Sequence, residues 1–318
     1  MESTGRITKD LHKLLTWGSD TCRTCGSKLD REALALAGYG ADGHPLYVGE
    51  CCSSSLRECA TFVRWWEHAG RRCDRETRLW RYMDFAKFLS ILETRAIYFP
   101  RADTLGDPFE GAAGIVDRRE QWNSFYRDFF RDAMMTAPRG DAPTPSEDEL
   151  VKYTERFIDS LAEMGARDRI RSYVSCWHAN DGESEALWRL YCPAPAPGIA
   201  IETTAERLME AFDYDPNIKL GRVRYVDFQE AFANVQDRLF WKRKSLSHES
   251  EVRAVIARDQ PAADIGLSIA ADVEKLLVSV VPSPFAGDWL TALVEATVKR
   301  YGVTTKVARS ELLLEPFF

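Results

Sequence analysis

Acidic side chains in the C-terminal part of the chain form the first pattern that could do chemistry. Glu249 and Glu251 lie two residues apart in the segment 249–256, where alternating apolar and polar residues predict a half-buried strand. Carboxylates at this spacing could stabilise positive charge in a transition state or bind a divalent cation. A ladder of ion pairs facing solvent is the structural alternative. The apolar face of this predicted strand consists of Val252, Ala254 and Ile256, and its charged face, turned to solvent or a cleft, of Glu249, Glu251 and Arg253.

Aromatic and polar residues are interleaved on a second predicted strand and on the helix after it. Residues two apart on a strand share one face, and residues three or four apart on a helix share one side. An apolar wall with a few polar groups suits a small-molecule pocket, and an aromatic face can stack on a planar ring. An aromatic stripe buried in the core is the alternative. The residues are Tyr173, Ser175, Trp177 and His178 on the strand, and Ser184, Trp188 and Tyr191 on the helix.

A turn with two carboxylates lies earlier in the chain. In the loop GDPFEG, residues 106–111, the proline and glycines predict a tight turn. Asp107 and Glu110 are three residues apart in it. They either hold the loop rigid through hydrogen bonds to its backbone or line the rim of a pocket.

Cysteines are concentrated near the N-terminus. Cys22 and Cys25 have the spacing of a zinc knuckle, because two thiolates around a tight turn can share one tetrahedral ion. Cys51 and Cys52 are adjacent and would have to reach the same ion from a loop-to-helix corner. Reduced cysteines without a metal are the alternative. The structural zinc ligands that we predict are Cys22, Cys25, Cys51 and Cys52.

The elements that position these residues interleave helices and strands without a regular βαβ rhythm. No glycine-rich strand–turn–helix phosphate motif is present, so neither a Rossmann unit nor a P-loop is supported. The sequence predicts an α+β fold with a mixed, mostly antiparallel central sheet and flanking helices. Strands are expected at 79–82, 96–99, 172–177, 198–202, 222–226, 249–256, 276–281 and 304–308. Helices are expected at 84–94, 115–136, 147–164, 183–191, 204–212, from after 226 to about 241, and at 289–301.

The composition shifts near residues 70–77, which predicts a boundary between two parts. Residues 1–76 would form a cysteine-rich module, and residues 77–318 an α/β body. The hydrophobic content of 45% is that of a globular chain with a sizeable core.

The charge and the apolar pattern indicate the compartment. A net charge of −7 excludes a global basic field that would attract nucleic acid or membrane. The first residues lack the apolar centre of a signal peptide, and no stretch approaches the roughly 18 apolar residues that span a bilayer. We therefore expect a cytoplasmic protein with reduced thiols and no membrane partner.

Taken together, the motifs resemble a widespread bacterial family of domains of unknown function, over roughly residues 78–310. Gly106 stands where that family usually has asparagine, and Pro282-Ser-Pro replaces a common Gly-Pro. The matching segments are Leu79-Trp80-Arg81-Tyr82, Asp107-Pro108-Phe109-Glu110, Ser175-Cys176-Trp177-His178, Trp188 with Tyr191, Gly198-Ile199-Ala200-Ile201, and His248-Glu249-Ser250-Glu251-Val252-Arg253.

The order of three residues also resembles the Arg–Ser–Glu scheme of the ADP-ribosyltransferase superfamily. The resemblance implies an ADP-ribosyltransferase-like core and an enzyme that consumes NAD, as a transferase or a glycohydrolase. Arg81 would bind the NAD phosphate, Ser175 would support the glutamate, and Glu251 would be catalytic. Glu249 would position the acceptor. The further NAD-contacting residues that the resemblance implies are Tyr82, Asp107, Glu110, Trp177, His178, Trp188, Tyr191 and Arg253.

Two other classes of function fit the same residues. A Mg²⁺-dependent nuclease would bind metal through Asp107, Glu110, Glu249 and Glu251, with Lys242 or Arg253 on the phosphate. A non-enzymatic sensor would recognise a nucleotide or a peptide in the aromatic pocket. The expected partners are a small-molecule nucleotide and a protein or nucleic-acid acceptor, in a toxin or phage-defence setting that the bacterial family suggests.

Overall fold

The computed structural model describes strands β1 (Ala35–Tyr39) and β2 (Pro45–Val48), residue 28, and the chain from residue 73 except residues 137–144, 194–196, 216 and 234–237. β1 and β2 pair antiparallel. The predicted zinc ligands Cys22, Cys25, Cys51 and Cys52 lie outside the described residues, and the boundary at residue 76 stays a prediction. In the described part of the chain, no group of three or more metal-binding side chains is placed to hold an ion, so zinc has no support there.

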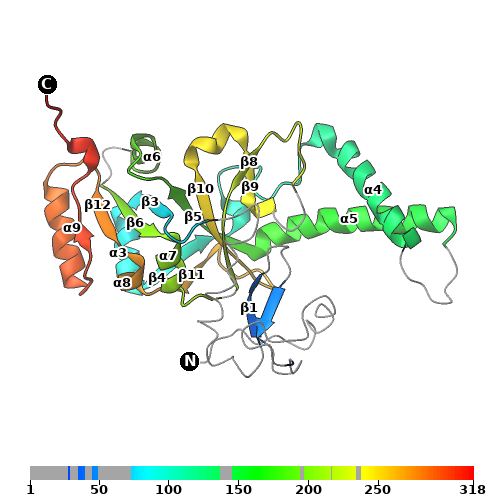
Figure 1. Cartoon of the computed structure of the whole chain (residues 1–318), viewed down its shortest axis with the longest axis horizontal. Helices are drawn as coiled ribbons and strands as arrows, with labels where there is room; N and C mark the ends of the chain where they lie inside the picture. Colours follow the sequence, from blue (N-terminus) through cyan, green and yellow to red (C-terminus); the bar gives the residue numbers. More distant parts are fainter. Residues whose placement is uncertain are drawn as a thin grey trace.

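A seven-stranded sheet forms the centre of the body (Figure 1). In spatial order its strands are β13 (Lys306–Val307), β12 (Ser279–Pro282), β6 (Gly198–Thr204), β3 (Arg78–Asp84), β5 (Ser172–Ala179), β10 (Glu251–Ala257) and β7 (Ile218–Arg222). Only β12 and β13 run parallel, and every other neighbouring pair is antiparallel. This confirms the predicted α+β class with a mostly antiparallel sheet.

Two smaller strand pairs adjoin the sheet. β4 (Ala96–Pro100) pairs antiparallel with β11 (Gly266–Ala270). β8 (Arg224–Val226) pairs in parallel with β9 (Trp241–Arg243). The helix expected from after residue 226 to about residue 241 is wrong in the described residues, because residues 228–230 form a turn and Arg238–Phe240 only a single 3₁₀ turn before β9 begins.

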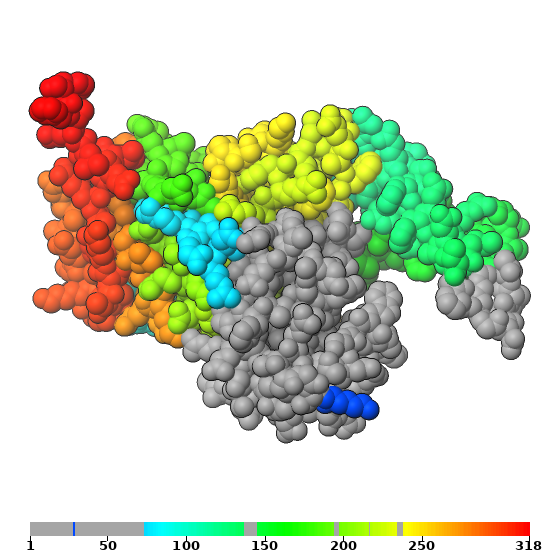
Figure 2. Space-filling model, in the orientation of Figure 1, coloured from blue at the N-terminus to red at the C-terminus, as the bar shows by residue number. Residues whose placement is uncertain are grey.

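Helices cover both sides of the sheet. They are α3 (Phe85–Thr94), α4 (Arg119–Thr136), α5 (Glu147–Arg171), α6 (Glu185–Tyr191), α7 (Ala205–Ala211), α8 (Val273–Leu276) and α9 (Trp289–Arg300). Figure 2 shows α4 and α5 as a projection at one end of the molecule, opposite the C-terminal residues. None of the described helices is both long enough and apolar enough to cross a membrane.

The two faces of the sheet differ in chemistry because alternate strand residues point to opposite sides. One side, which we call the core face, packs under α3, α7, α8 and α9. Its strand residues include Leu79, Ile201, Trp177, Val252 and Ala254. The other side, which we call the charged face, carries Tyr82, His178, Glu251 and Arg253. Whether a strand residue lies on the core face or on the charged face thus depends on whether its position along the strand is odd or even.

Asp84 ends β3 and caps α3, since its carboxylate accepts a hydrogen bond from the backbone N of Lys87 at 2.8 Å. Replacing Asp84 with Ala should lower the free energy of unfolding by about 1 kcal/mol, because the first turn loses this cap. Lys87→Ala, which removes only an exposed ion pair with Asp84, should cost clearly less. Urea denaturation measures both changes. Equal losses would show that the cap adds nothing to the ion pair.

Candidate functional site

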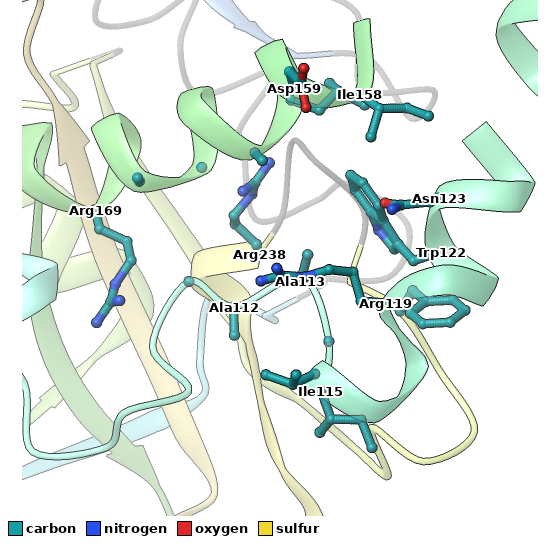
Figure 3. A pocket seen from close by; sticks show the side chains of 18 residues that line it. Ala112, Ala113, Ile115, Arg119, Trp122, Asn123, Ile158, Asp159, Arg169 and Arg238 are labelled. Carbon is teal, nitrogen blue, oxygen red and sulfur yellow. The ribbon is translucent and has the colours of Figure 1, made fainter. Parts of the chain in front are cut away.

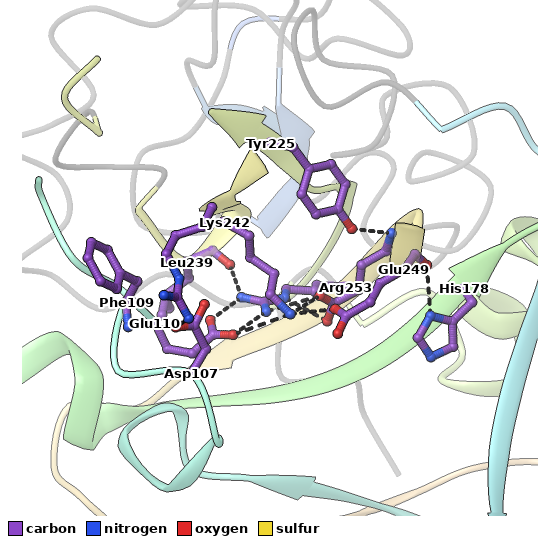
Figure 4. Close-up of polar contacts among 11 residues, drawn as sticks. Asp107, Phe109, Glu110, His178, Tyr225, Leu239, Lys242, Glu249 and Arg253 are labelled. Carbon is purple, nitrogen blue, oxygen red and sulfur yellow. Dashed lines mark hydrogen bonds and ion pairs between the residues drawn. The ribbon is translucent and has the colours of Figure 1, made fainter. Parts of the chain in front are cut away.

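Lys242 lies at the centre of a buried group of charges on the charged face (Figure 4). Its Nζ is 2.5 Å from Glu249 Oε2, 3.0 Å from Glu251 Oε2 and 3.7 Å from Glu110 Oε1. We call Glu110, Lys242, Glu249, Glu251 and Arg253 the charge cluster. The three carboxylates come from a loop, a 3₁₀ turn and β10, and Lys242 from β9.

Arg253 is the second cation of the charge cluster, and its side chain is 0% exposed. Its Nη1 and Nη2 donate to the two carboxylate oxygens of Glu110 at 2.6 and 2.7 Å. Its Nε donates to Glu251 Oε1 at 2.9 Å, and Nη1 also donates to the carbonyl of Leu239 at 2.6 Å. Three carboxylates against two cations leave the charge cluster with a formal excess of negative charge.

The ionisation of the charge cluster follows from competition between burial and pairing. Burial alone would raise the pKa of Glu251, but the charges of Arg253 and Lys242 outweigh it and lower this pKa to about 2. Burial likewise opposes the charge on Lys242, and the pKa of its ammonium is nevertheless raised, chiefly by Glu251. Glu251, Lys242 and Arg253 are therefore all charged at neutral pH.

Neighbouring residues fix the geometry of the charge cluster. Asp107 Oδ1 accepts hydrogen bonds from the backbone N of Phe109 at 3.1 Å and from Arg243 Nη2 at 2.8 Å. The Arg243 guanidinium also lies 4.8 Å from the centre of the Phe109 ring. Tyr225 Oη accepts from the backbone N of Glu251 at 2.7 Å. Asp107 thus holds the loop rigid, and Glu110 enters the charge cluster.

Aromatic rings adjoin the charge cluster on the same face. His178 Nδ1 lies 2.8 Å from the carbonyl oxygen of Glu249, and because a carbonyl only accepts, this nitrogen carries a proton. Burial lowers the pKa of His178, so the ring is neutral at neutral pH. The rings of Tyr191 and Tyr82 lie 5.2 and 6.0 Å from it, and Tyr82 contacts Trp188 edge-on. Tyr191 is 40% exposed, so the aromatic group reaches solvent there.

Arg81 and Ser175 meet on the core face, away from Glu251. Arg81 Nη1 donates to Ser175 Oγ at 2.9 Å, and Trp177 Nε1 donates to the same oxygen at 3.1 Å. In the antiparallel pair β5–β10, Ser175 is opposite Ala254, and Glu251 is opposite His178. The expected support of Glu251 by Ser175 is therefore wrong, because the sheet separates them.

The expectation that Glu249, Glu251 and Arg253 form a strand face turned to solvent is also wrong, because all three are buried. Glu251 is 2% exposed and Arg253 is fully buried. Glu249 does not belong to the strand but ends the 3₁₀ turn 244–249 and is 7% exposed. The central place of Lys242 and the contact of Tyr225 were missed, since pairing of β8 with β9 brings them in and no local pattern indicates it.

Comparisons with known proteins give weak similarity only. No family model and no curated protein matches the chain. Structures of DarT from Thermus sp. 2.9 are similar to it: the complex with carba-NAD+ at TM-score 0.34 and 8% identity, covering 75% of this chain and 97% of that chain. The complex with NAD+ gives TM-score 0.33 at 7% identity, covering 75% and 98%, and the complex with ADP-ribosylated ssDNA gives 0.32 at 8%, covering 75% and 97%. TM-scores this low establish no common fold, so the function is inferred from this chain's own residues.

Removing Lys242 should destabilise the protein, because it leaves buried carboxylates without their cation. Lys242→Met should lower the free energy of unfolding by about 3–5 kcal/mol. Glu249→Gln in the same chain should recover part of this loss, since it removes one of those charges. A double-mutant cycle by urea denaturation measures the coupling. As control, Glu202→Gln on β6, whose carboxylate pairs with Arg78 and Ser279, should be additive with Lys242→Met. Additivity of Glu249→Gln would contradict the ion pair.

Stability should fall as the pH is lowered through about 6.5, the ordinary pKa of histidine. The pKa of His178 is lower in the folded state, so the unfolded chain binds the proton first and protonation favours unfolding. His178→Gln should therefore flatten this decline, by up to about 1.4 kcal/mol per pH unit. Urea denaturation between about pH 7.5 and 5 measures it. The matched control is His248→Gln, at an exposed position, and an equal effect of both would contradict the assignment.

Proposed function

We propose that the chain is an NAD-consuming enzyme that cleaves the bond between nicotinamide and ribose and transfers ADP-ribose to an acceptor. One observation carries the proposal: Glu249 and Glu251 converge on Lys242 at the start of β10, beside a group of aromatic rings. The two glutamates therefore lie next to an aromatic surface on which a planar leaving group can stack.

Cleavage of the bond between nicotinamide and ribose is favoured by negative charge next to the ribose. When the C–N bond breaks, its electron pair leaves with nicotinamide, and positive charge develops on the ribose. Carboxylates stabilise such oxocarbenium-like transition states in glycoside hydrolysis. Glu251 is ionised, and the charge cluster has more carboxylates than cations, so its field favours this cation.

Exposure separates the roles of the two glutamates. Glu249 is the least buried carboxylate of the charge cluster, so it is the group that meets the ribose or the acceptor. Glu251 is more deeply buried, with its Oε2 3.0 Å from Lys242 Nζ, and stabilises the same positive charge from a longer distance. Both are proposed as necessary for turnover, Glu249 in contact and Glu251 through its charge.

The aromatic group supplies the binding surface for nicotinamide. Tyr191, the exposed ring, and Tyr82 beneath it flank His178, and planar rings stack favourably on such residues. His178 is neutral at neutral pH and can accept a proton from an acceptor nucleophile. Trp188, Asp107, Glu110 and Arg253 hold these groups in position. Arg81, Ser175 and Trp177 have no part in this site, because they lie on the core face.

A Mg²⁺-dependent nuclease is the competing use of the same carboxylates. Glu110, Glu249 and Glu251 surround Lys242, but in the described part of the chain they are not placed to hold a metal ion together, and their oxygens bind Lys242 and Arg253. A metal ion would have to displace both cations. The described residues give no support to a toxin or phage-defence role.

The test is incubation of the purified protein with NAD labelled in the adenylate part, alone and with cell extract. The wild type should release nicotinamide and transfer label to an acceptor. Glu251→Gln and Glu249→Gln should each reduce turnover by about 100-fold or more, the scale of losing one group that stabilises transition-state charge. Glu202→Gln is the matched control, since this carboxylate on β6 pairs with Arg78 on β3 and Ser279 on β12, outside the charge cluster. It should keep wild-type turnover.

Two outcomes would reject the proposal. If the wild-type protein neither binds nor consumes NAD, with or without cell extract, the remaining alternative is a non-enzymatic sensor. Cleavage of nucleic acid that EDTA abolishes and that Glu249→Gln removes would establish the nuclease. Thermal melting of every variant separates loss of chemistry from loss of fold.

A further inference from the structure

A cavity of about 500 Å³ lies between the arm of α4 and α5 and the loop that follows Glu110 (Figure 3). Small residues leave this space open: Gly111, Ala112, Ala113 and Gly114 on the loop, and Ala162, Gly165 and Ala166 on α5. Its size falls in the range of about 300–1,000 Å³ typical of small-molecule sites. The cavity is distinct from the charge cluster, because none of the five cluster residues lines it.

The polar lining of the cavity is mainly cationic. Arg119, Arg169 and Arg238 line it, against the single carboxylate of Asp159. Neither Arg119 nor Arg169 forms an ion pair with any residue that the structure describes. Asp168, outside the lining, attracts the charge of Arg238. Three guanidinium groups against the two carboxylates of Asp159 and Asp168 leave a formal excess of positive charge. Guanidinium groups bind phosphate through paired hydrogen bonds, so this lining suits a phosphate.

Trp122 adds a second kind of contact. Its side chain is 8% exposed, and its indole Nε1 has no hydrogen-bond partner among the described residues. A buried donor without an acceptor is uncommon in folded proteins and costs free energy, so an acceptor on a ligand would satisfy it. Figure 3 shows Trp122, Arg119 and Arg238 around the same space. Phe232 and Ile115 supply apolar lining.

We propose that this cavity binds a free nucleoside 5′-monophosphate, with its phosphate on the arginines and its base beside Trp122. The base supplies the ring nitrogens and carbonyls that accept from the indole N–H, and its flat surface covers the apolar lining. The sugar spans the distance between them. Binding at this site does not depend on the NAD chemistry proposed for the charge cluster.

The chain connects the two sites directly. Gly111 lines the cavity and follows Glu110, which binds Arg253. Arg238 lines the cavity and precedes Leu239, whose carbonyl accepts from the same Arg253. The segments that line the cavity therefore also supply two partners of Arg253.

The test uses isothermal titration calorimetry on the full chain with the four ribonucleoside 5′-monophosphates. Gly165→Ala is the sharpest variant, because a Cβ at this position would overlap the Arg238 guanidinium and displace it. Alanine also favours the helix, so this variant should remain folded. At least one monophosphate should bind the wild type, and Gly165→Ala and Arg119→Gln should each weaken it at least 10-fold. Gly106→Ala is the matched control, since its Cβ would meet nothing within 4 Å, and should bind normally.

Further probes separate the parts of the ligand and the two sites. The parent nucleoside and inorganic phosphate should each bind at least 10-fold more weakly than the monophosphate. Glu249→Gln should bind the monophosphate normally even if it loses NAD turnover, so failure of one proposal leaves the other standing. No binding of any monophosphate, equal binding of the nucleoside, or loss of binding in Glu249→Gln would overturn the site. Tighter binding of a 5′-phosphorylated oligonucleotide would overturn the free nucleotide as ligand.

Discussion

A guanidinium without any exposed surface, that of Arg253, is the constraint on which this side of the molecule depends. Moving such a charge out of water costs several kcal/mol, and only close partners with good geometry offset it. Arg253 obtains them from Glu110 on a distant loop, Glu251 on its own strand and the carbonyl of Leu239. Satisfying one buried cation thus ties the loop at residues 107–110 and the segment before β9 to the centre of the sheet.

The second cation follows from the first. Glu110 and Glu251 satisfy Arg253 and still have oxygens near Lys242, which Glu249 approaches more closely than either. The carboxylates are therefore shared between cations rather than paired one to one. Shared pairs of this kind hold their charges at fixed positions, so their field is set before any ligand arrives.

The central fold was accessible from the sequence because its strands and helices are locally patterned. Apolar alternation located β10, and the acidic N-cap and apolar spacing located α3. β8 lies within the strand expected at 222–226, but β9 and β11 escaped prediction, since they are short and depend on pairing with partners far along the chain. Pattern alone therefore predicted elements that carry their own signal and missed those that depend on tertiary contacts.

The site was predictable by residue type more than by arrangement. The loop carboxylates, the glutamates near β10 and the aromatic residues of β5 and α6 were all singled out. Their grouping was not, because Lys242 joins the carboxylates from β9, a short strand that the sequence did not predict. The order Arg81, Ser175, Glu251 also suggested one site where the structure shows two.

The register of β5 against β10 has a consequence for comparing this chain with others. Side chains of a strand alternate between faces, so which face a residue occupies depends on whether its offset from its neighbours is odd or even. Ser175 faces Ala254, an odd number of residues from Glu251. Inserting or deleting one residue at the start of β10 would turn Glu251 to the face of the sheet that carries Arg81 and Ser175. The order of the motifs along the chain would not change. For this fold, an alignment that keeps motif order but ignores strand parity can join residues that the sheet keeps apart.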